Sequence, residues 1–240
     1  MKGNVLSAFF DGLIRDFTNN LLVGDRYLLI LDGLKTTLII ATGAAIIGVF
    51  LGTILALMRL SHVKLGKKWY ILRSISGAYV NVVRGTPMVV QLMMMYYVIL
   101  SSTSLSKTTI SILSFGLNSG AYVSEMIRGG ILAVDKGQEE AGRSLGLSRG
   151  LTMRHIILPQ SIRIAIPSLF NEFIMLLKET SIVGFIGLMD LTKAGDFIRS
   201  RTYSAFFPLL IVAVIYLMIV TVLTAFFTRL ERRLRAGANK

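Results

Sequence analysis

The sequence has no cysteine, only two histidines, and few charged residues, which make up 16% of its 240 positions. The missing cysteines exclude a disulfide scaffold and thiolate metal sites, and two histidines argue against a histidine-rich metal site. An average soluble domain carries about 25% charged residues. With 53% hydrophobic residues, a soluble fold of this chain would expose too much apolar surface to stay dissolved. The composition therefore indicates a protein whose solvent is largely lipid.

The few charges are biased in sign, because 26 Lys and Arg outnumber 13 Asp and Glu and give a net charge of +13. In a soluble protein this excess would suggest binding to nucleic acid. In a membrane protein it is typical of loops that face the cytoplasm and anionic lipid. We therefore expect membrane lipid, and no nucleic acid, among the partners.

Long uncharged runs predict membrane-spanning helices. Residues 36–58 and 202–228 are uncharged over 23 and 27 positions, and a span needs about 20. Gly48 and Gly52 form a GxxxG pair in the first run, which favours close packing with another span. Between the two runs, three rougher apolar stretches complete an all-α membrane protein. The five predicted spans are residues 30–60, 69–101, 108–134, 163–189 and 205–228.

Basic residues gather in three of the connecting segments. Residues 59–73, 128–163 and 229–240 hold five, six and five Lys and Arg, whereas the segments on the opposite side hold eight. The positive-inside rule then predicts an N-terminus outside and a C-terminus in the cytoplasm.

The chain divides into five consecutive parts. Residues 1–26 carry apolar residues at helical spacing, which indicates either a short helix in the outer interface or an extension of the first span. The other parts are spans one to three (27–134), a polar cytoplasmic loop (135–162), spans four and five (163–228), and a basic cytoplasmic tail (229–240).

The polar loop carries local folding signals. Asp135, followed three residues later by Gln138, is an acidic variant of a capping box and predicts a helix directly after it. Gly146 predicts the end or a bend of that helix, and Ser148 is suited to cap a second helix, which Pro159 then disturbs. The loop should therefore fold as two short helices joined by a turn, which we call the elbow (residues 135–159).

The elbow resembles a motif of permease subunits of ATP-binding-cassette importers. The motif reads Glu-Ala-Ala, three residues, Gly, nine residues, Ile, one residue, Leu-Pro. The chain matches each spacing, with Gly142 in place of the second Ala: Glu140-Ala141-Gly142, Gly146, Ile156, Leu158, Pro159.

Three further groups are similar to type I importer permeases for polar amino acids such as histidine, arginine, glutamine and cystine. They are residues 81–87 with Val90 and Gln91; residues 118–122 with Glu125 and Arg128; and residues 171–173 with residues 178–181. The resemblance covers roughly residues 30 to 236. Asn81 stands where this family often has Glu, which weakens the assignment of a cationic substrate.

The resemblance implies the fold of type I importer permeases, a bacterial plasma-membrane location, and ATP-driven import of a polar or charged L-amino acid by alternating access. ATP and Mg²⁺ would belong to a separate dimer of ATPase subunits, in accord with the lack of a phosphate-binding loop in this chain. A second permease copy or a paralogue and an extracytoplasmic amino-acid-binding protein are the other implied partners. The predicted coupling residues, which would dock in the ATPase, are Glu140, Ala141, Gly142, Ser144, Leu145, Gly146 and Leu147.

Polar residues inside the spans are the candidate substrate ligands, because a charge at the bilayer centre costs about 2.5–3.5 kcal/mol. Lys178 is suited to the carboxylate of an amino acid, and Glu179 or Glu125 to its ammonium group. Amide and phenol groups are suited to reading its side chain. The predicted substrate-binding residues are Lys178, Glu179, Asn118, Tyr122, Glu125, Arg84, Thr86, Gln91 and Asn81.

Alternatives remain at this point. Lys178 and a Glu can form a purely structural pair, and Arg84 can pair with Glu125 as scaffold. The whole chain can also be read as an ion channel or ion-coupled carrier that uses Glu125, Glu172 and Glu179 as a relay. An intramembrane enzyme lacks a supporting catalytic motif.

Overall fold

The computed structural model describes residues 12, 15, 17–60 and 67–236, and within these residues the regular structure is helical. The predicted interfacial helix near the N-terminus falls mostly outside them. The long elements are α2 (Arg26–Leu60), α3 (Lys67–Arg84), α5 (Lys107–Leu132), α8 (Leu158–Glu179) and α10 (Phe206–Ala236). The short ones are η1 (Thr18–Leu22), η2 (Val23–Asp25), α4 (Met88–Met94), η3 (Met95–Ile99), α6 (Lys136–Ser144), α7 (Arg149–Thr152), η4 (Met153–Ile157), η5 (Thr180–Ile186) and α9 (Leu191–Thr202).

The centre of the molecule is the packing of α2 against α5, the most extensive contact between two elements. The two backbones approach closely because of glycine. A methyl group added at Gly52 would lie 2.6 Å from Cβ of Val123, and one at Gly120 would lie 2.8 Å from Cδ2 of Leu51. The close packing predicted from the GxxxG pair is thus confirmed.

The predicted second span, residues 69–101, is not one straight helix. The segments Tyr70–Arg84 and Met88–Ile99 meet at 106°. Pro87, in extended conformation, precedes α4, so the helical hydrogen-bond ladder stops and carbonyls at the end of α3 lose their partners. Side chains replace them: Thr86 Oγ1 donates to Val82 O at 3.0 Å, and Gln91 Nε2 donates to Val83 O at 2.8 Å.

Length and apolar composition qualify two of the described helices as membrane spans, residues 18–59 and 206–234, and a third if the bent pair counts as one. Helices α5 and α8 are more polar for a structural reason. The buried face of α5 is rich in small polar residues, and α8 carries Glu172, Lys178 and Glu179. Helix α5 packs against both α2 and α8. Helix α8 buries one set of residues, which includes Leu176 and Leu177, and exposes others, which include Lys178. Polar residues are tolerated where such a helix faces protein or water and not lipid. The count of five spans stays a prediction.

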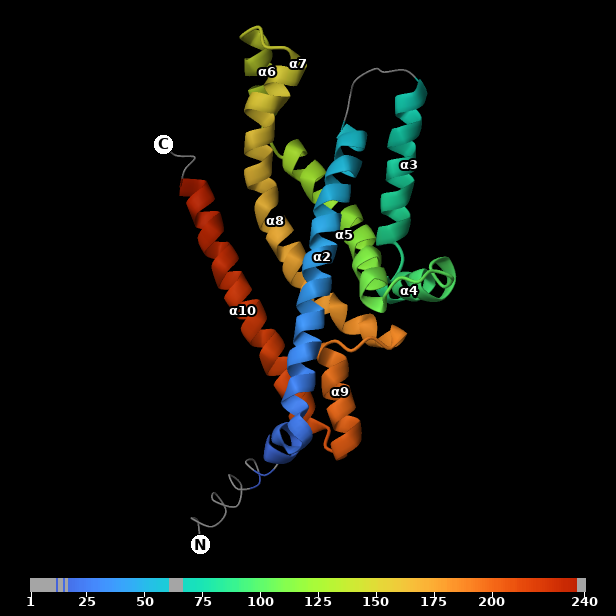
Figure 1. The fold of residues 1–240 in the computed structure, drawn as a ribbon. Helices are drawn as coiled ribbons and strands as arrows, with labels where there is room; N and C mark the ends of the chain where they lie inside the picture. The colour runs from blue at the N-terminus through green and yellow to red at the C-terminus, as the bar shows by residue number, and fades with distance from the viewer. Residues whose placement is uncertain (1–11, 13–14, 16, 61–66, 237–240) are drawn as a thin grey trace.

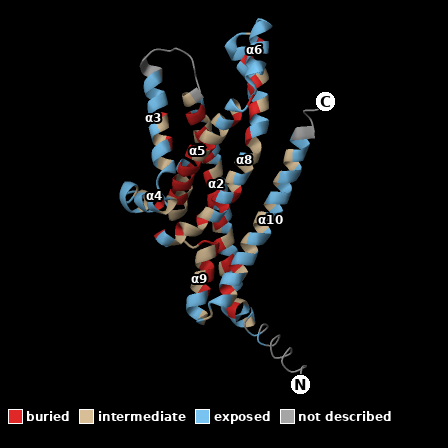
Figure 2. Cartoon of the chain, turned by 180° about the vertical axis from the view of Figure 1, so that it is seen from behind, coloured by how far each residue is buried: buried red, intermediate tan, exposed pale blue. Residues whose placement is uncertain are grey.

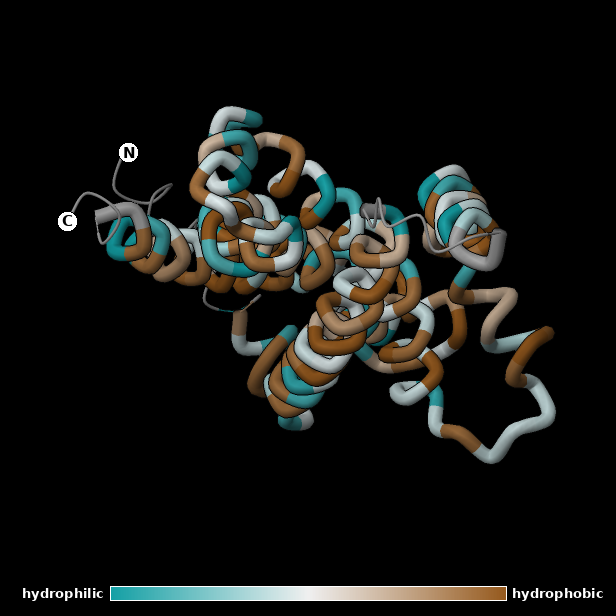
Figure 3. The backbone as a smooth tube through the Cα atoms, turned by 90° about the horizontal axis from the view of Figure 1, so that it is seen from above, coloured by the Kyte–Doolittle hydropathy of each residue, from teal (hydrophilic) through white to brown (hydrophobic). Residues whose placement is uncertain are grey.

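Burial and hydropathy are distributed as expected for a chain surrounded by lipid. Buried residues follow α2 and α5, whereas α10 is mostly exposed (Figure 2). Hydrophobic segments lie at the periphery of the molecule as well as in its centre (Figure 3).

The basic segments lie towards one end of the molecule. The end of α2, the start of α3, the elbow with α6 and α7, and the C-terminal end of α10 are in the upper part of Figure 1, whereas α9 and the start of α2 are at the bottom. This agrees with the single-sided charge bias of the sequence. Helix α9 follows the predicted fourth span and was not anticipated as a separate element.

Candidate functional site

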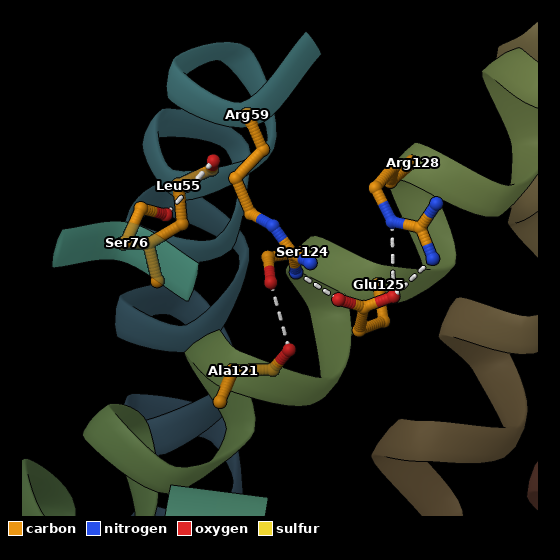
Figure 4. A network of polar contacts seen from close by, with 7 residues as sticks. All are labelled: Leu55, Arg59, Ser76, Ala121, Ser124, Glu125 and Arg128. Carbon is orange, nitrogen blue, oxygen red and sulfur yellow. Dashed lines mark hydrogen bonds and ion pairs between the residues drawn. The ribbon is translucent and has the colours of Figure 1, made fainter. Parts of the chain in front are cut away.

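Glu125 on α5 lies between two arginines. Its Oε1 accepts a hydrogen bond from Arg59 at the end of α2, and its Oε2 accepts from Arg128 Nε at 3.0 Å and Nη2 at 2.6 Å (Figure 4). The side chain of Glu125 is 17% exposed. The structure therefore gives this predicted ammonium ligand two cationic partners within the chain, and neither is Arg84, the partner considered from the sequence.

Three of the predicted substrate residues form one hydrogen-bonded group at the α3–α4 break. Gln91 Nε2 donates to Thr86 Oγ1 at 2.7 Å, and Gln91 Oε1 accepts from Asn118 Nδ2 at 3.0 Å. Asn118 is buried, whereas Thr86 is exposed. The group ties the bend to α5 and presents amide groups from α4 and α5 and a hydroxyl group from the connection between α3 and α4.

Two further predicted residues lie on either side of this group. The guanidinium carbon of Arg84, at the end of α3, lies 5.2 Å from the centre of the Tyr122 ring on α5. Arg84 is exposed and forms no ion pair with a carboxylate of the described residues. Asn81, one turn earlier on α3, is also exposed. Arg84 is thus a cation whose only described partner is an aromatic face.

Helix α8 contributes carboxylates. Glu172 Oε1 accepts from Ser119 Oγ at 2.9 Å, which joins α8 to α5 next to Asn118. Glu179, half-buried, and Lys178, exposed, end the helix. Within the described part of the chain, neither residue is hydrogen-bonded to the group formed by Gln91 and Asn118. Apart from Glu125, which lies between its two arginines, the predicted ligands therefore fall into two sets, one around the α3–α4 break and one at the end of α8.

The first part of the elbow folds as its local signals predict, whereas the helix that begins at Arg149 continues through η4 into α8, with Pro159 in the first turn of α8. Asp135 caps α6 by accepting from Gly137 N at 2.6 Å, and Ser148 caps α7 by accepting from Leu151 N at 3.3 Å. Gly146, at φ 83°, ends α6 in the left-handed conformation. Leu147 N donates to Gly142 O and Gly146 N donates to Arg143 O, the two bonds of a Schellman motif.

Two details of the elbow differ from the expectation. Gln138 does not complete a capping box, because its Oε1 accepts from Gln160 of α8 at 3.3 Å. Gly142 is buried against the elbow itself, where an added methyl group would lie 2.8 Å from Cγ2 of Thr152 and 2.9 Å from Cδ1 of Ile156. Glycine at this position therefore serves packing within the elbow, while Leu145 points outward with 82% of its surface exposed.

Sequence reasoning missed Arg59 and Ser119 as site residues. Arg59 was counted only as a loop charge, because its contact with Glu125 depends on how α2 packs against α5. Gly48 meets Ser119 and Gly52 meets Val123, so contacts advance together along both helices. The same offset would place Arg59 beside Gly130, so the long arginine side chain reaches back along α5 to Glu125.

Comparison with known proteins identifies the family. Residues 48–236 match the family described as binding-protein-dependent transport system inner membrane component. The chain belongs to this family. A putative glutamine transport system permease protein of Rickettsia typhi is 38% identical over 87% of this permease and 94% of its own length. An arginine transport system permease protein of Bacillus subtilis is 39% identical over 87% and 93%.

Solved structures agree on the fold of the permease. A chain from a crystal structure of an amino acid ABC transporter with histidines matches with a TM-score of 0.79 and 40% identity, over 86% of this chain and 94% of that chain. A chain of an inward-facing methionine ABC transporter matches with a TM-score of 0.71 and 20% identity, over 86% and 96%, which supports the fold alone. The protein is thus a membrane-embedded permease subunit of an ATP-binding-cassette importer, and the carrier, channel and enzyme alternatives fall away.

Proposed function

We propose that this permease forms the membrane path for a polar L-amino acid and moves it by alternating access. The observation that carries the substrate class is the similarity, over nearly the whole chain, to permeases named for glutamine and arginine transport and to an amino acid transporter structure. Asn81 in place of a frequent Glu favours a neutral polar side chain over a cationic one.

The partners are proposed by the same reasoning. A dimer of separate ATPase subunits binds ATP with Mg²⁺, a second permease copy or a paralogue completes the path, and an extracytoplasmic binding protein delivers the amino acid. The structure of the elbow supports the proposed contact with the ATPase. Its folded tip exposes Leu145, and the elbow lies at the same end of the molecule as the other basic segments. An apolar side chain this exposed on a polar hairpin is suited to a pocket in a partner protein.

The substrate ligands are assigned according to charge. Lys178 meets the carboxylate and Glu179 the ammonium group, while Gln91, Asn118 and Tyr122 read the side chain. These groups supply the charged and polar contacts that a zwitterion needs away from water. Glu125 is better explained as scaffold, because Arg59 and Arg128 already occupy both of its carboxylate oxygens.

The test is uptake of radiolabelled L-amino acids into proteoliposomes that hold the permease, its ATPase and its binding protein. Uptake should require ATP and all three components. Replacing Leu145 with Asp should abolish stimulation of the ATPase by loaded binding protein, whereas Leu145→Met, which keeps an apolar side chain, should retain it. Replacing Lys178 with Ala should raise KM without changing assembly. Uphill transport by the permease alone, or unchanged transport by Lys178→Ala, would contradict these assignments.

A further inference from the structure

A cavity of about 550 Å³ lies beside the start of α5 and is not part of either set of predicted ligands. It forms where η3, the connection of residues 100–106 and the first turn of α5 meet. Its polar lining includes Tyr96, Tyr97, Ser101, Thr103, Ser106 and Lys107. The cavity is therefore roomy and carries one formal charge.

The charge of Lys107 has only neutral partners. Its Nζ donates to the carbonyl oxygen of Gly187 at 3.2 Å and lies 5.7 Å from the centre of the Tyr96 ring. No carboxylate of the described residues pairs with it. An ammonium group has three N–H donors, so one hydrogen bond to a carbonyl leaves capacity for an anionic group in the cavity.

The hydroxyl groups of the same cavity can accept hydrogen bonds from a ligand. Ser101 Oγ donates to Val98 O at 3.1 Å, and Thr103 Oγ1 donates to Leu100 O at 2.7 Å. Since their protons are used in these bonds, both oxygens face other groups as acceptors. A cationic donor and neutral acceptors in one cavity match the carboxylate and ammonium groups of a zwitterion.

The position of the cavity relates it to the transport path. Lys107 and Asn118 lie on the same helix, 11 residues apart, which at 1.5 Å per residue is about 16 Å along α5. Lys107 lies at the end of α5 that points away from the elbow. We propose that this cavity is an outer subsite, in which Lys107 receives the carboxylate of an amino acid before it reaches the groups around Asn118. The inference rests on the proposed function.

The direct test uses the assembled wild-type complex of permease, ATPase and binding protein. Lysines are acylated briefly with an amine-reactive reagent, and mass spectrometry compares Lys107 with Lys35, an exposed lysine of α2 that serves as internal control. A mixture of L-amino acids should protect Lys107 relative to Lys35. The matching mixture of α-amides, in which a neutral carboxamide replaces each carboxylate, should give no such protection.

Substitutions extend the test to transport. Lys107→Met should raise the KM of uptake about tenfold, the effect of losing one charge-assisted hydrogen bond, and Lys107→Arg should restore it, while Lys35→Met should leave it unchanged. Uptake by the wild-type complex without protection of Lys107 would overturn the outer subsite and leave the proposed function intact. Equal protection by acids and amides would overturn the carboxylate assignment. Absence of any amino-acid uptake would instead overturn the proposed function.

Discussion

Replacing Glu125 with Gln tests whether this residue stabilises the permease or binds substrate. The substitution keeps the shape of the side chain but removes the charge between Arg59 and Arg128. Side-chain exposure is 17% for Glu125, 21% for Arg59 and 34% for Arg128, so the cluster is only partly shielded from solvent. The loss leaves two neighbouring guanidinium groups without their shared counter-charge.

The expected loss of stability for Glu125→Gln lies between two limits. Removing one partner of a fully buried ion pair costs about 3–5 kcal/mol, whereas an exposed pair is worth about 0–1 kcal/mol. For the observed exposure we expect a loss of about 2 kcal/mol in the free energy of unfolding. For a chain of this size, that corresponds to a fall in Tm of roughly 4–8 °C.

The assay is thermal unfolding of the purified complex, arranged as a double-mutant cycle with Glu125→Gln, Arg59→Gln and the double variant. Because the two residues act on each other, the double variant should lose less stability than the sum of the single variants. Asp32→Asn, which removes an exposed carboxylate on α2, should leave Tm unchanged. An unchanged Tm for Glu125→Gln together with a large rise in the KM for amino acid would refute the scaffold role and restore Glu125 as a substrate ligand.

Three further predictions concern the elbow, the contact between α2 and α5, and helix α9. Gly146→Ala places a side chain on a residue with φ 83°, which costs about 1–2 kcal/mol of strain. This substitution should weaken the stimulation of the ATPase by the loaded binding protein. The control Gly150→Ala adds a methyl group in open space and should not weaken it. Gly52→Leu overfills the contact with Val123, which should reduce the free energy of unfolding by about 1–3 kcal/mol and lower Tm. The control Gly77→Leu, on α3, should leave Tm nearly unchanged, because nothing lies within 4 Å of an added Cβ there. In α9, hydrogen bonds from Arg199 and Lys193 lower the pKa of Asp196. The stabilisation of α9 should be complete above the usual pKa of an aspartate and be lost as pH falls through the lowered value. Hydrogen exchange that shows α9 opening at neutral pH would contradict this ion-pair cluster.

The elbow was predictable because its signals are local. A cap such as Asp135 or Ser148 acts on amides two or three residues away, and the left-handed turn at Gly146 follows from the absence of a side chain at that residue. The part that failed, the capping role of Gln138, involves a competitor from α8 that is distant in sequence. A local signal therefore fails where a residue distant in sequence forms a hydrogen bond with the same side chain.

The polar cluster around Glu125 was not predictable in the same way. Glu125 and Arg128 are neighbours on α5, but Arg59 comes from α2, and its contact with Glu125 depends on how α2 and α5 are rotated against each other. Arg84 and Arg59 are both basic residues near helix ends, and only the packing register selects Arg59. Similarly, the motif at residues 85–87 indicates a break but not its angle, which depends on the bonds that Gln91 makes across it.

The sharp bend between α3 and α4 also affects depth in the bilayer. A straight span descends 1.5 Å per residue, so residues 88–99 would cover about 16 Å of depth. A segment turned by 106° from its predecessor instead runs nearly parallel to the membrane plane when α3 follows the membrane normal. Spin labels placed in turn along Met88–Ile99 would then report almost constant immersion, with an oscillation at the helical period, rather than a steady gradient towards one surface.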